Sequence, residues 1–444
     1  MNMTEDQIII QIIKNIKEGK RKEFQEILDE LHPYDIARIF ESLPEKHYTR
    51  FLLFLYPEQI AELIQELDKE YQLKVLAKLG GEKSGPVMDL MDNDDLASLL
   101  EHLSPEKIDE LLSGMKQEES TIVKNIMNYS PETAGRLMTN RFVWIPQHYT
   151  VRETVDKLKI FAEFSETINY LYVIDEEKRL VGVVSYRDLI LADEYEKIYD
   201  IMFSRVISVS TDADQEEVAR VIERYDFLAV PVVENNNELV GIVTVDDIID
   251  VFIQEANEDI EKLSASGKAI DFDTKAFVAA YRRLPWLILL LFIGLVSGTI
   301  ISGFEDTLSK VVALTFFMPM IAGMTGNTGT QSLAVVVRGL ATHDINKKVV
   351  LKLIFREFSV GCGILISIIA YIWQGSPVLG LVVGSSLIMT LIIGTLAGTI
   401  IPLILYRFKI DPAVASGPLI TTLNDILSLL IYFGIATAFI SKLM

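Results

Sequence analysis

Hydrophobic and polar positions divide the chain into two unlike halves. Up to about residue 273, apolar residues recur every three to four positions or in short runs between charged residues. Five long apolar stretches follow, over residues 285–303, 311–340, 351–373, 378–405 and 415–440. About 20 residues of helix cross the hydrocarbon core of a bilayer, so each stretch predicts a membrane span. We therefore expect a multidomain membrane protein that ends in a five-helix α transmembrane domain over residues 282–444.

The first 135 residues predict an all-α domain. Three segments, DIARIFESLPEK, QIAELIQELDKE and DLASLLEHLSPEK, resemble one another loosely and show helical spacing of apolar residues. Their separation is irregular, which favours a small superhelical bundle of helix pairs over a strict repeat. No chemistry-bearing motif appears in it, so we expect a docking or regulatory domain.

A clear duplication follows. LMTNRFVWIP at 137–146 corresponds to IMFSRVISVS at 201–210, and LVGVVSYRDL at 180–189 corresponds to LVGIVTVDDI at 239–248. Each copy predicts the order strand, helix, strand, turn, strand, helix. This order and the closing GxVSxxDL and GxVTxxDI signatures resemble a tandem pair of CBS domains, an α/β module. The predicted boundaries are residues 136–199 and 200–252.

Charge sharpens the division of the chain. Residues 1–273 hold 56 acidic and 29 basic side chains, whereas residues 274–444 hold six acidic and twelve basic ones. The acidic half argues against a nucleic-acid partner, because phosphate binding needs clustered Lys and Arg. Residues 246–273 carry nine acids against two lysines. This run predicts an acidic connecting helix at 253–281, either as a solvated helix face or as a site for cations.

The basic residues predict the orientation in the membrane. Arg282 and Arg283 precede the first span, further Lys and Arg residues flank the second connection, and Arg407 and Lys409 lie in the fourth. Because cytoplasmic loops are enriched in Lys and Arg, we expect cytoplasmic N-terminal and CBS domains and a C-terminus outside the cytoplasmic (inner) membrane. The N-terminus shows no secretory signal. A lone cysteine, Cys362, excludes an intrachain disulfide and a CxxC metal site.

Polar residues interrupt the second predicted span. Residues 326–332 read GNTGTQS inside an otherwise apolar stretch. Glycines allow helices to approach closely and amides bond across helices, so tight packing explains such a segment. A pathway for a polar substrate explains it equally well, because polar groups in a bilayer are costly unless paired or solvated. Both interpretations stay open at this point.

The fifth span carries a carboxylate. Asp425 follows Asn424, and Asp425, Thr421 and Gly417 fall on one helical face. The span has no Lys or Arg before Lys442, so Asp425 stays ionised only if water and a cation reach it. Oxygen ligands without His or Cys favour Mg²⁺ or Ca²⁺. Na⁺ or H⁺ use of the same carboxylate, or a protonated Asp bonded to a neighbouring helix, are the alternatives.

Taken together, the helical domain, the CBS pair, the acidic connecting helix and the five spans resemble the MgtE family of Mg²⁺ channels and transporters. The motifs PxxxxxxGNxGxQ (Pro319–Gln331) and GPxxTTxxD (Gly417–Asp425) carry the resemblance. It implies a homodimer whose pore lies between the second and fifth spans, with Asp425 holding hydrated Mg²⁺. The residues expected along the ion pathway are Asp425, Thr421, Gly417, Asn424, Asn327 and Gln331.

The resemblance also implies that Mg²⁺ bound between the helical domain, the CBS pair and the connecting helix holds the pore shut. Bare acids repel one another and divalent ions bridge them, so bridging favours the compact state. The candidate metal ligands besides Asp425 are Asp89, Asp92, Asp95, Asp226, Asp247, Asp250, Glu255, Glu258 and Asp259.

ATP is the expected regulatory ligand of the CBS pair, as the resemblance implies. Ser185, Arg187 and Asp188 are placed to meet phosphate and ribose, while Tyr170 and Phe227 are placed to flank a base. A CBS pair that serves dimerisation alone is the alternative.

The leading hypothesis is a Mg²⁺-selective channel or transporter that cytosolic Mg²⁺ gates. The first alternative is a Na⁺- or H⁺-coupled divalent cation transporter or exchanger that uses Asp425 as its coupling site. A nucleotide sensor with a plain membrane anchor is disfavoured, because an anchor needs no polar motifs in two spans. No P-loop, HExxH or nucleophile motif appears, so we do not expect an enzyme.

Overall fold

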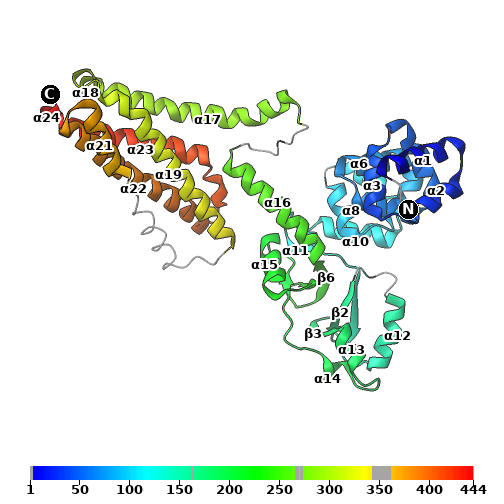
Figure 1. Cartoon of the computed structure of the whole chain (residues 1–444). Helices are drawn as coiled ribbons and strands as arrows, with labels where there is room; N and C mark the ends of the chain where they lie inside the picture. Colours follow the sequence, from blue (N-terminus) through cyan, green and yellow to red (C-terminus); the bar gives the residue numbers. More distant parts are fainter. Residues whose placement is uncertain are drawn as a thin grey trace. The chain divides into compact units, whose positions relative to one another are not determined.

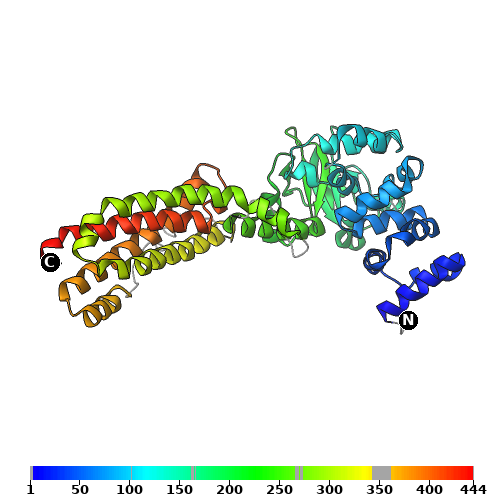
Figure 2. The same ribbon diagram turned by 90° about the horizontal axis from the view of Figure 1, so that it is seen from above.

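The chain forms two compact units, Met1–Phe252 and Ile253–Met444, in a computed structural model (Figures 1 and 2). The structure describes residues 4–101, 103–161, 165, 167–265, 270, 274–342 and 362–443. Each unit has its own hydrophobic clusters, and the two are described separately.

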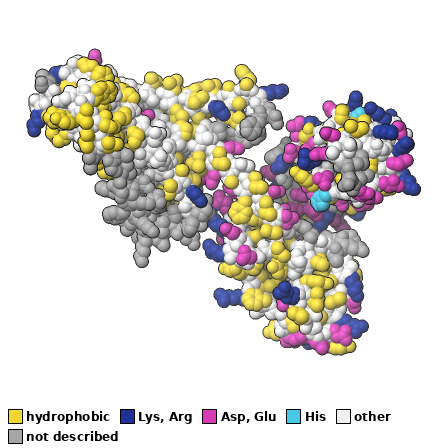
Figure 3. All heavy atoms as spheres, viewed as in Figure 1, with side chains coloured by type: hydrophobic (Ala, Val, Ile, Leu, Met, Phe, Trp, Pro, Cys, Tyr) yellow, Lys and Arg dark blue, Asp and Glu magenta, His cyan; other side chains and the backbone are white. Residues whose placement is uncertain are grey.

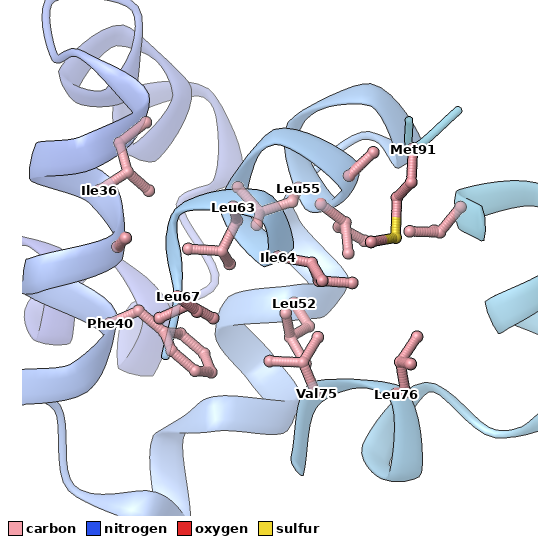
Figure 4. Close-up of a cluster of buried hydrophobic side chains, with 14 of the residues drawn as sticks. Ile36, Phe40, Leu52, Leu55, Leu63, Ile64, Leu67, Val75, Leu76 and Met91 are labelled. Carbon is pink, nitrogen blue, oxygen red and sulfur yellow. The ribbon is translucent and has the colours of Figure 1, made fainter. Parts of the chain in front are cut away.

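The expected all-α domain opens the first unit. Its short helices are amphipathic, and several begin at a proline, which fits the first helical turn because proline lacks an N–H. One cluster, with Phe24, Phe40 and Phe51 fully buried, forms the core of this domain. Figure 4 shows part of it, where side chains of α3, α4, α5 and α6 converge. The helices are α1 (Glu5–Glu18), α2 (Arg21–Leu28), α3 (Pro33–Ser42), η1 (Glu45–His47), α4 (Tyr48–Phe54), α5 (Pro57–Glu66), α6 (Lys69–Leu79), α7 (Gly81–Met88), α8 (Asn93–Leu100), α9 (Pro105–Leu112) and α10 (Gln117–Met127).

The duplicated segment forms two three-stranded sheets with the same topology. In each sheet the first two strands are parallel and the last two antiparallel, in the orders β1-β2-β3 and β4-β5-β6. The strands are β1 (Phe142–Pro146), β2 (Thr167–Ile174), β3 (Leu180–Ser185), β4 (Val209–Ser210), β5 (Ala229–Val233) and β6 (Leu239–Thr244). The helices around them are α11 (Ala134–Leu137), α12 (Val151–Phe161), α13 (Tyr186–Leu191), α14 (Ile198–Ile201) and α15 (Gln215–Tyr225). The tandem CBS arrangement is confirmed.

Each sheet receives a methionine from the segment that precedes the other copy's first strand. A methyl group added at Gly241 of β6 would lie 2.7 Å from the Met138 sulfur, and one added at Gly182 of β3 would lie 2.4 Å from the Met202 sulfur. The two strand glycines at matching positions therefore let a side chain from outside the sheet pack directly on the backbone. This reciprocal packing ties the two copies into one body.

The second unit is a bundle of long apolar helices, and its visible surface is largely hydrophobic, in contrast to the charged surface over α1–α10 (Figure 3). Within the described ranges, α17, α22 and α23 are long and apolar enough to cross a membrane, and α21 has a shorter apolar stretch. The first part of the third predicted span 351–373, residues 351–361, lies outside the described residues, and α21 covers the rest. The helices are α17 (Ala276–Gly303), α18 (Glu305–Lys310), α19 (Leu314–Thr342), α21 (Cys362–Gln374), α22 (Pro377–Arg407), η2 (Pro412–Val414), α23 (Gly417–Ala438) and α24 (Ile440–Leu443).

The acidic run begins as a helix that continues from the last CBS strand. Helix α16 (Val245–Leu263) carries Asp246 to Glu261 of the run, while Asp271 and Asp273 lie outside the described residues. The next described helix, α17, begins at Ala276. The predicted connecting segment 253–281 thus contains the end of α16 and the start of α17.

Candidate functional site

Helices α19, α22 and α23 meet closely through glycines. A methyl group added at Gly398 of α22 would lie 2.2 Å from the backbone oxygen of Gly329 in α19, and one at Gly394 would lie 2.8 Å from that of Thr325. One at Gly326 would lie 2.8 Å from a methyl carbon of Thr421 in α23. The glycines of GNTGTQS therefore serve helix packing, as small residues do in membrane helices.

The amide side chains of the same motif lie on the opposite face of α19 from these glycines. Asn327 and Gln331, one helical turn apart, are exposed in the single chain, whereas Gly326, Gly329 and Ser332 are buried. The motif thus has two faces, one packed against α22 and α23 and one carrying amides away from them. Both interpretations drawn from the sequence have a counterpart in this geometry.

Helix α23 holds the carboxylate. Pro418 lies in the first turn of α23, and Asp425 lies two turns further on. Residues Asp425, Thr421 and Gly417 are half-buried on one helical face, and the Thr421 hydroxyl donates to the Gly417 carbonyl at 2.9 Å. Among the described residues, no side chain makes an ion pair or hydrogen bond with the Asp425 carboxylate. The carboxylate is half-buried and keeps an accessible surface.

Asn424 lies on a different side of α23. It is fully buried, its amide nitrogen donates to the Thr325 carbonyl at 3.5 Å, and a methyl group at Gly329 would lie 2.0 Å from that nitrogen. Its side-chain oxygen has no hydrogen-bond partner among the described residues. The structure places Asn424 inside the junction with α19, apart from the face of Asp425.

In the first unit, two of the predicted acids share a partner. The Gln65 amide donates to Asp92 at 2.6 Å and to Asp95 at 3.1 Å, and Arg141 makes an ion pair with Asp92 at 3.2 Å. Asp95 keeps an exposed surface, but it lies in a crowded recess. Burial there, with the like charges of Asp92, Asp250 and Asp246, raises the pKa of the Asp95 carboxyl against the opposing effect of the Gln65 hydrogen bond.

Other predicted acids hold local structural positions. Asp89 accepts a hydrogen bond from the Lys116 backbone N–H at 2.9 Å, and Asp247 accepts one from the Thr244 hydroxyl at 2.6 Å. Asp226 ends α15 in the left-handed region at φ 52°. Glu255, Glu258 and Asp259 lie on α16. Within the described parts of the chain, no three His, Cys, Asp or Glu side chains already converge as a metal site.

Four of the five predicted nucleotide residues line two cavities of the CBS pair, which adjoin at Tyr170. Tyr170, Ser185 and Arg187 border one of about 640 Å³, and Tyr170 and Phe227 border a second, apolar one of about 130 Å³. Asp188 lies one helical turn after Ser185, and its carboxylate accepts a hydrogen bond from the Ser185 hydroxyl at 2.5 Å. The five residues therefore gather, with an aromatic pair at the apolar end and an arginine at the open end.

Several residues that shape these sites were not predicted from the sequence, although one pair of them forms a recognisable pattern. Gly394 and Gly398 form a GxxxG pattern in α22, which signals close helix packing. Gln65 and Arg141 lie 27 and 49 residues from Asp92, so no local pattern points to them. No local sequence pattern predicts the ion pair between Lys262 and Asp411, at 2.6 Å, either.

Three family models match the chain. The model of MgtE divalent cation transporters matches residues 318–435, the model of the MgtE intracellular N domain matches 31–132, and the CBS model matches twice, at 134–195 and 198–254.

Two similar proteins match all or most of the chain. The magnesium transporter MgtE of Bacillus subtilis (strain 168) is 64% identical over 100% of this chain and 99% of its own length. The magnesium transporter MgtE of Thermus thermophilus is 41% identical over 71% of each chain.

Two solved structures are similar to the first unit. The soluble part of a magnesium transporter is 38% identical with a TM-score of 0.55, covering 57% of this chain and 100% of that one. The cytosolic domain of the Mg²⁺ channel MgtE in complex with ATP is 35% identical with a TM-score of 0.52, covering 55% of this chain and 99% of that one. The family expected from the sequence is confirmed: the chain belongs to the MgtE family of divalent cation transporters.

Proposed function

We propose that this protein carries Mg²⁺ into the cell across the cytoplasmic membrane as a Mg²⁺-selective channel or transporter, and that cytosolic Mg²⁺ shuts it. The observation that carries the proposal is the position of Asp425. This carboxylate lies inside an apolar helix, and no described side chain pairs with it. The chain belongs to a family of divalent cation transporters. An intramembrane carboxylate without a protein partner is the expected place for a cation pathway.

The ligand chemistry favours Mg²⁺. Mg²⁺ binds hard oxygen ligands and gives up its water reluctantly, so one carboxylate with neighbouring hydroxyl and carbonyl oxygens suits the hydrated ion. Asp425, Thr421 and Gly417 offer that set along one face of α23. Asn327 and Gln331 add amide oxygens on the exposed face of α19, and we assign Asn424 a bracing role inside the helix junction.

A homodimer completes this pathway in the proposal. Among the described residues of the predicted spans, one chain supplies one carboxylate, Asp425, which is a weak site for a divalent cation. Two copies facing each other would supply two carboxylates and two sets of Asn327 and Gln331 amides. The exposed amides on α19, which are costly against lipid, support a partner on that face.

The gate follows from the acids of the first unit and α16. Asp95 lies close enough to Asp92 and to acids of α16 for their negative charges to raise the pKa of its carboxyl. Divalent cations relieve such repulsion and thereby favour the compact state by mass action. A swing of the gate from 1:99 to 99:1 needs about 5.5 kcal/mol of differential binding, which several weakly bound ions supply together. The proposed Mg²⁺ ligands of the gate are the nine acids predicted from the sequence, from Asp89 to Asp259.

ATP is the proposed regulatory ligand of the CBS pair. The related cytosolic domain that binds ATP is similar to the first unit, and the two adjoining cavities match the halves of a nucleotide. The apolar cavity beside Tyr170 and Phe227 suits a base, and the open one beside Arg187 suits phosphate.

The proposed organisation follows the charge and the spans. It comprises a regulatory domain at 1–135, CBS domains at 136–199 and 200–252, a connecting helix at 253–281 and a pore domain at 282–444. The regulatory domains face the cytoplasm and the C-terminus lies outside. Transport, and not catalysis, is the proposed activity.

The test is Mg²⁺ influx into liposomes that contain the purified protein, with Na⁺ and proton gradients collapsed by ionophores. We expect influx to follow the Mg²⁺ gradient alone and to stop when Mg²⁺ is raised on the side of the regulatory domains. Influx that requires a Na⁺ or proton gradient would instead establish the coupled transporter.

A further inference from the structure

The end of helix α16 is fixed to the bundle of the second unit by a lysine shared between two carboxylates. Lys262 makes an ion pair with Glu258, one turn earlier on α16, and a second with Asp411 at 2.6 Å. The Lys262 and Asp411 side chains are 33% and 34% exposed, so solvent screens the pair only partly. Partial burial opposes the charged ammonium, yet hydrogen bonds and charges of the two carboxylates outweigh it and raise the pKa of Lys262.

Asp411 uses its two oxygens for different contacts. One accepts a hydrogen bond from the Ala413 backbone N–H at 2.8 Å and caps the short helix η2, while the other binds Lys262. The turn that carries Asp411 leads directly into α23, which begins at Gly417. The ion pair therefore joins α16 to the turn that sets where α23 starts.

Apolar contacts surround the ion pair. Leu263 packs on a cluster formed by Leu333 and Val337 of α19, Ala413 and Ala415 of the turn, and Ile420 of α23. A methyl group added at Gly417 would lie 3.4 Å from the Leu263 backbone oxygen, so the end of α16 touches the first residue of α23. The two helices in this cluster, α19 and α23, carry the two polar motifs of the membrane domain.

We propose that Lys262 is a positioning residue that ties the end of α16 to the turn before α23, so that movement of α16 is passed on to the helix bearing Asp425. The inference rests on the proposed gating function. The apolar cluster seats α16, whereas the ion pair holds its register against the turn, because a charged pair is directional and apolar contact is not. Without Lys262, α16 slides on the cluster and transmits closure poorly.

The test measures the cytosolic Mg²⁺ concentration that halves Mg²⁺ influx into liposomes containing the full-length protein. Lys262→Ala should raise that concentration about fivefold, equivalent to about 1 kcal/mol, with unchanged influx at low Mg²⁺. Lys262→Arg keeps the charge and should restore a value near that of the wild type. Asp411→Asn keeps the oxygen that caps η2 but loses the charge, and should shift the concentration in the same direction.

A double-mutant cycle separates coupling from general weakening. If Lys262 acts through Asp411, the combined Lys262→Ala and Asp411→Asn variant should shift the concentration no more than the larger single variant. Lys409→Ala, which removes a neighbouring exposed charge, is the matched control and should leave the concentration unchanged.

Closure of Lys262→Ala at the wild-type concentration, or fully additive shifts in the cycle, would overturn the inference while leaving the proposed function intact. A wild-type protein that conducts Mg²⁺ without closing would overturn the gating proposal itself.

Discussion

The carboxylates of the two units show how surroundings change the role of one chemical group. In the bundle, Asp425 lies within a 22-residue apolar helix with no described partner. In the first unit, Asp92 shares Gln65 with Asp95 and pairs with Arg141, and acids of α16 lie near. A lone carboxylate in an apolar setting has no substitute, whereas each member of an acidic cluster does. Substitutions should therefore act in an all-or-none way in the bundle and gradually in the cluster.

The largest effect is expected at Asp425. Asp425→Ala and Asp425→Asn should abolish Mg²⁺ influx, because no other described Asp or Glu lies within α23. Influx into liposomes measures the effect, and size-exclusion chromatography checks that the variants still assemble. Asp306→Asn removes an exposed carboxylate from α18 and serves as the control, with wild-type influx expected. Substantial influx through Asp425→Asn would refute the pathway assignment.

The acids of α16, which the proposed gate uses together with Asp92 and Asp95, should have a large effect only when several are lost. Replacing Asp250, Glu255, Glu258 and Asp259 together with their amides should leave influx active at high cytosolic Mg²⁺, while each single replacement should shift closure only modestly. Influx measured across a Mg²⁺ titration provides the readout. The control neutralises four acids of α1 and α2, namely Glu5, Asp6, Glu23 and Glu26, and should close normally. Normal closure of the test variant would contradict the sensor role.

Helix packing in the bundle should tolerate no added volume where the motifs meet. Gly329→Ala places a methyl group 2.0 Å from the Asn424 amide and should cost about 1–3 kcal/mol of stability. Gly323→Ala on the same helix meets nothing within 4 Å and is the matched control. Thermal unfolding in detergent compares the two variants. Equal unfolding temperatures would show that the junction has room that the structure does not contain.

The smallest effect is expected at Asp95. The pKa of its carboxyl is raised in the folded chain, so ionisation costs stability once the pH exceeds the unfolded-state pKa. Asp95→Asn should therefore raise the unfolding temperature in Mg²⁺-free buffer near neutral pH, by about 1–2 °C, and this gain should vanish in acid. Added Mg²⁺ should stabilise the variant less than the wild type. A lower unfolding temperature for the variant would mean that Asp95 is stabilised as a charged group.

The order of the domains could be predicted from the sequence because hydrophobic residues recur at a different spacing in each domain. The duplicated strand pattern required two similar sheets, and the acidic run continued the helix after β6. The polar motif of α19 was ambiguous in the sequence for a physical reason: its glycines and its amides face opposite sides of one helix.

Contacts between distant segments were beyond the sequence. Asn424 and Asp425 are neighbours in the chain, yet Asn424 is fully buried against Thr325 and Asp425 is half-buried on another face, which depends on how α23 is rotated against α19. Lys262 and Asp411 lie 149 positions apart in the numbering, and a surface lysine beside an acid is common in any sequence. Such partners emerge only from three-dimensional packing.

Recording of Mg²⁺ current across a bilayer, with independent control of Mg²⁺ on each face, tests the central claim most directly. With Na⁺ and protons at equal concentration on both faces, we predict Mg²⁺ current through the wild type, its loss in Asp425→Asn, and closure as Mg²⁺ rises on the regulatory face. Current that persists in Asp425→Asn, or that never closes with Mg²⁺ on either face, would contradict this claim.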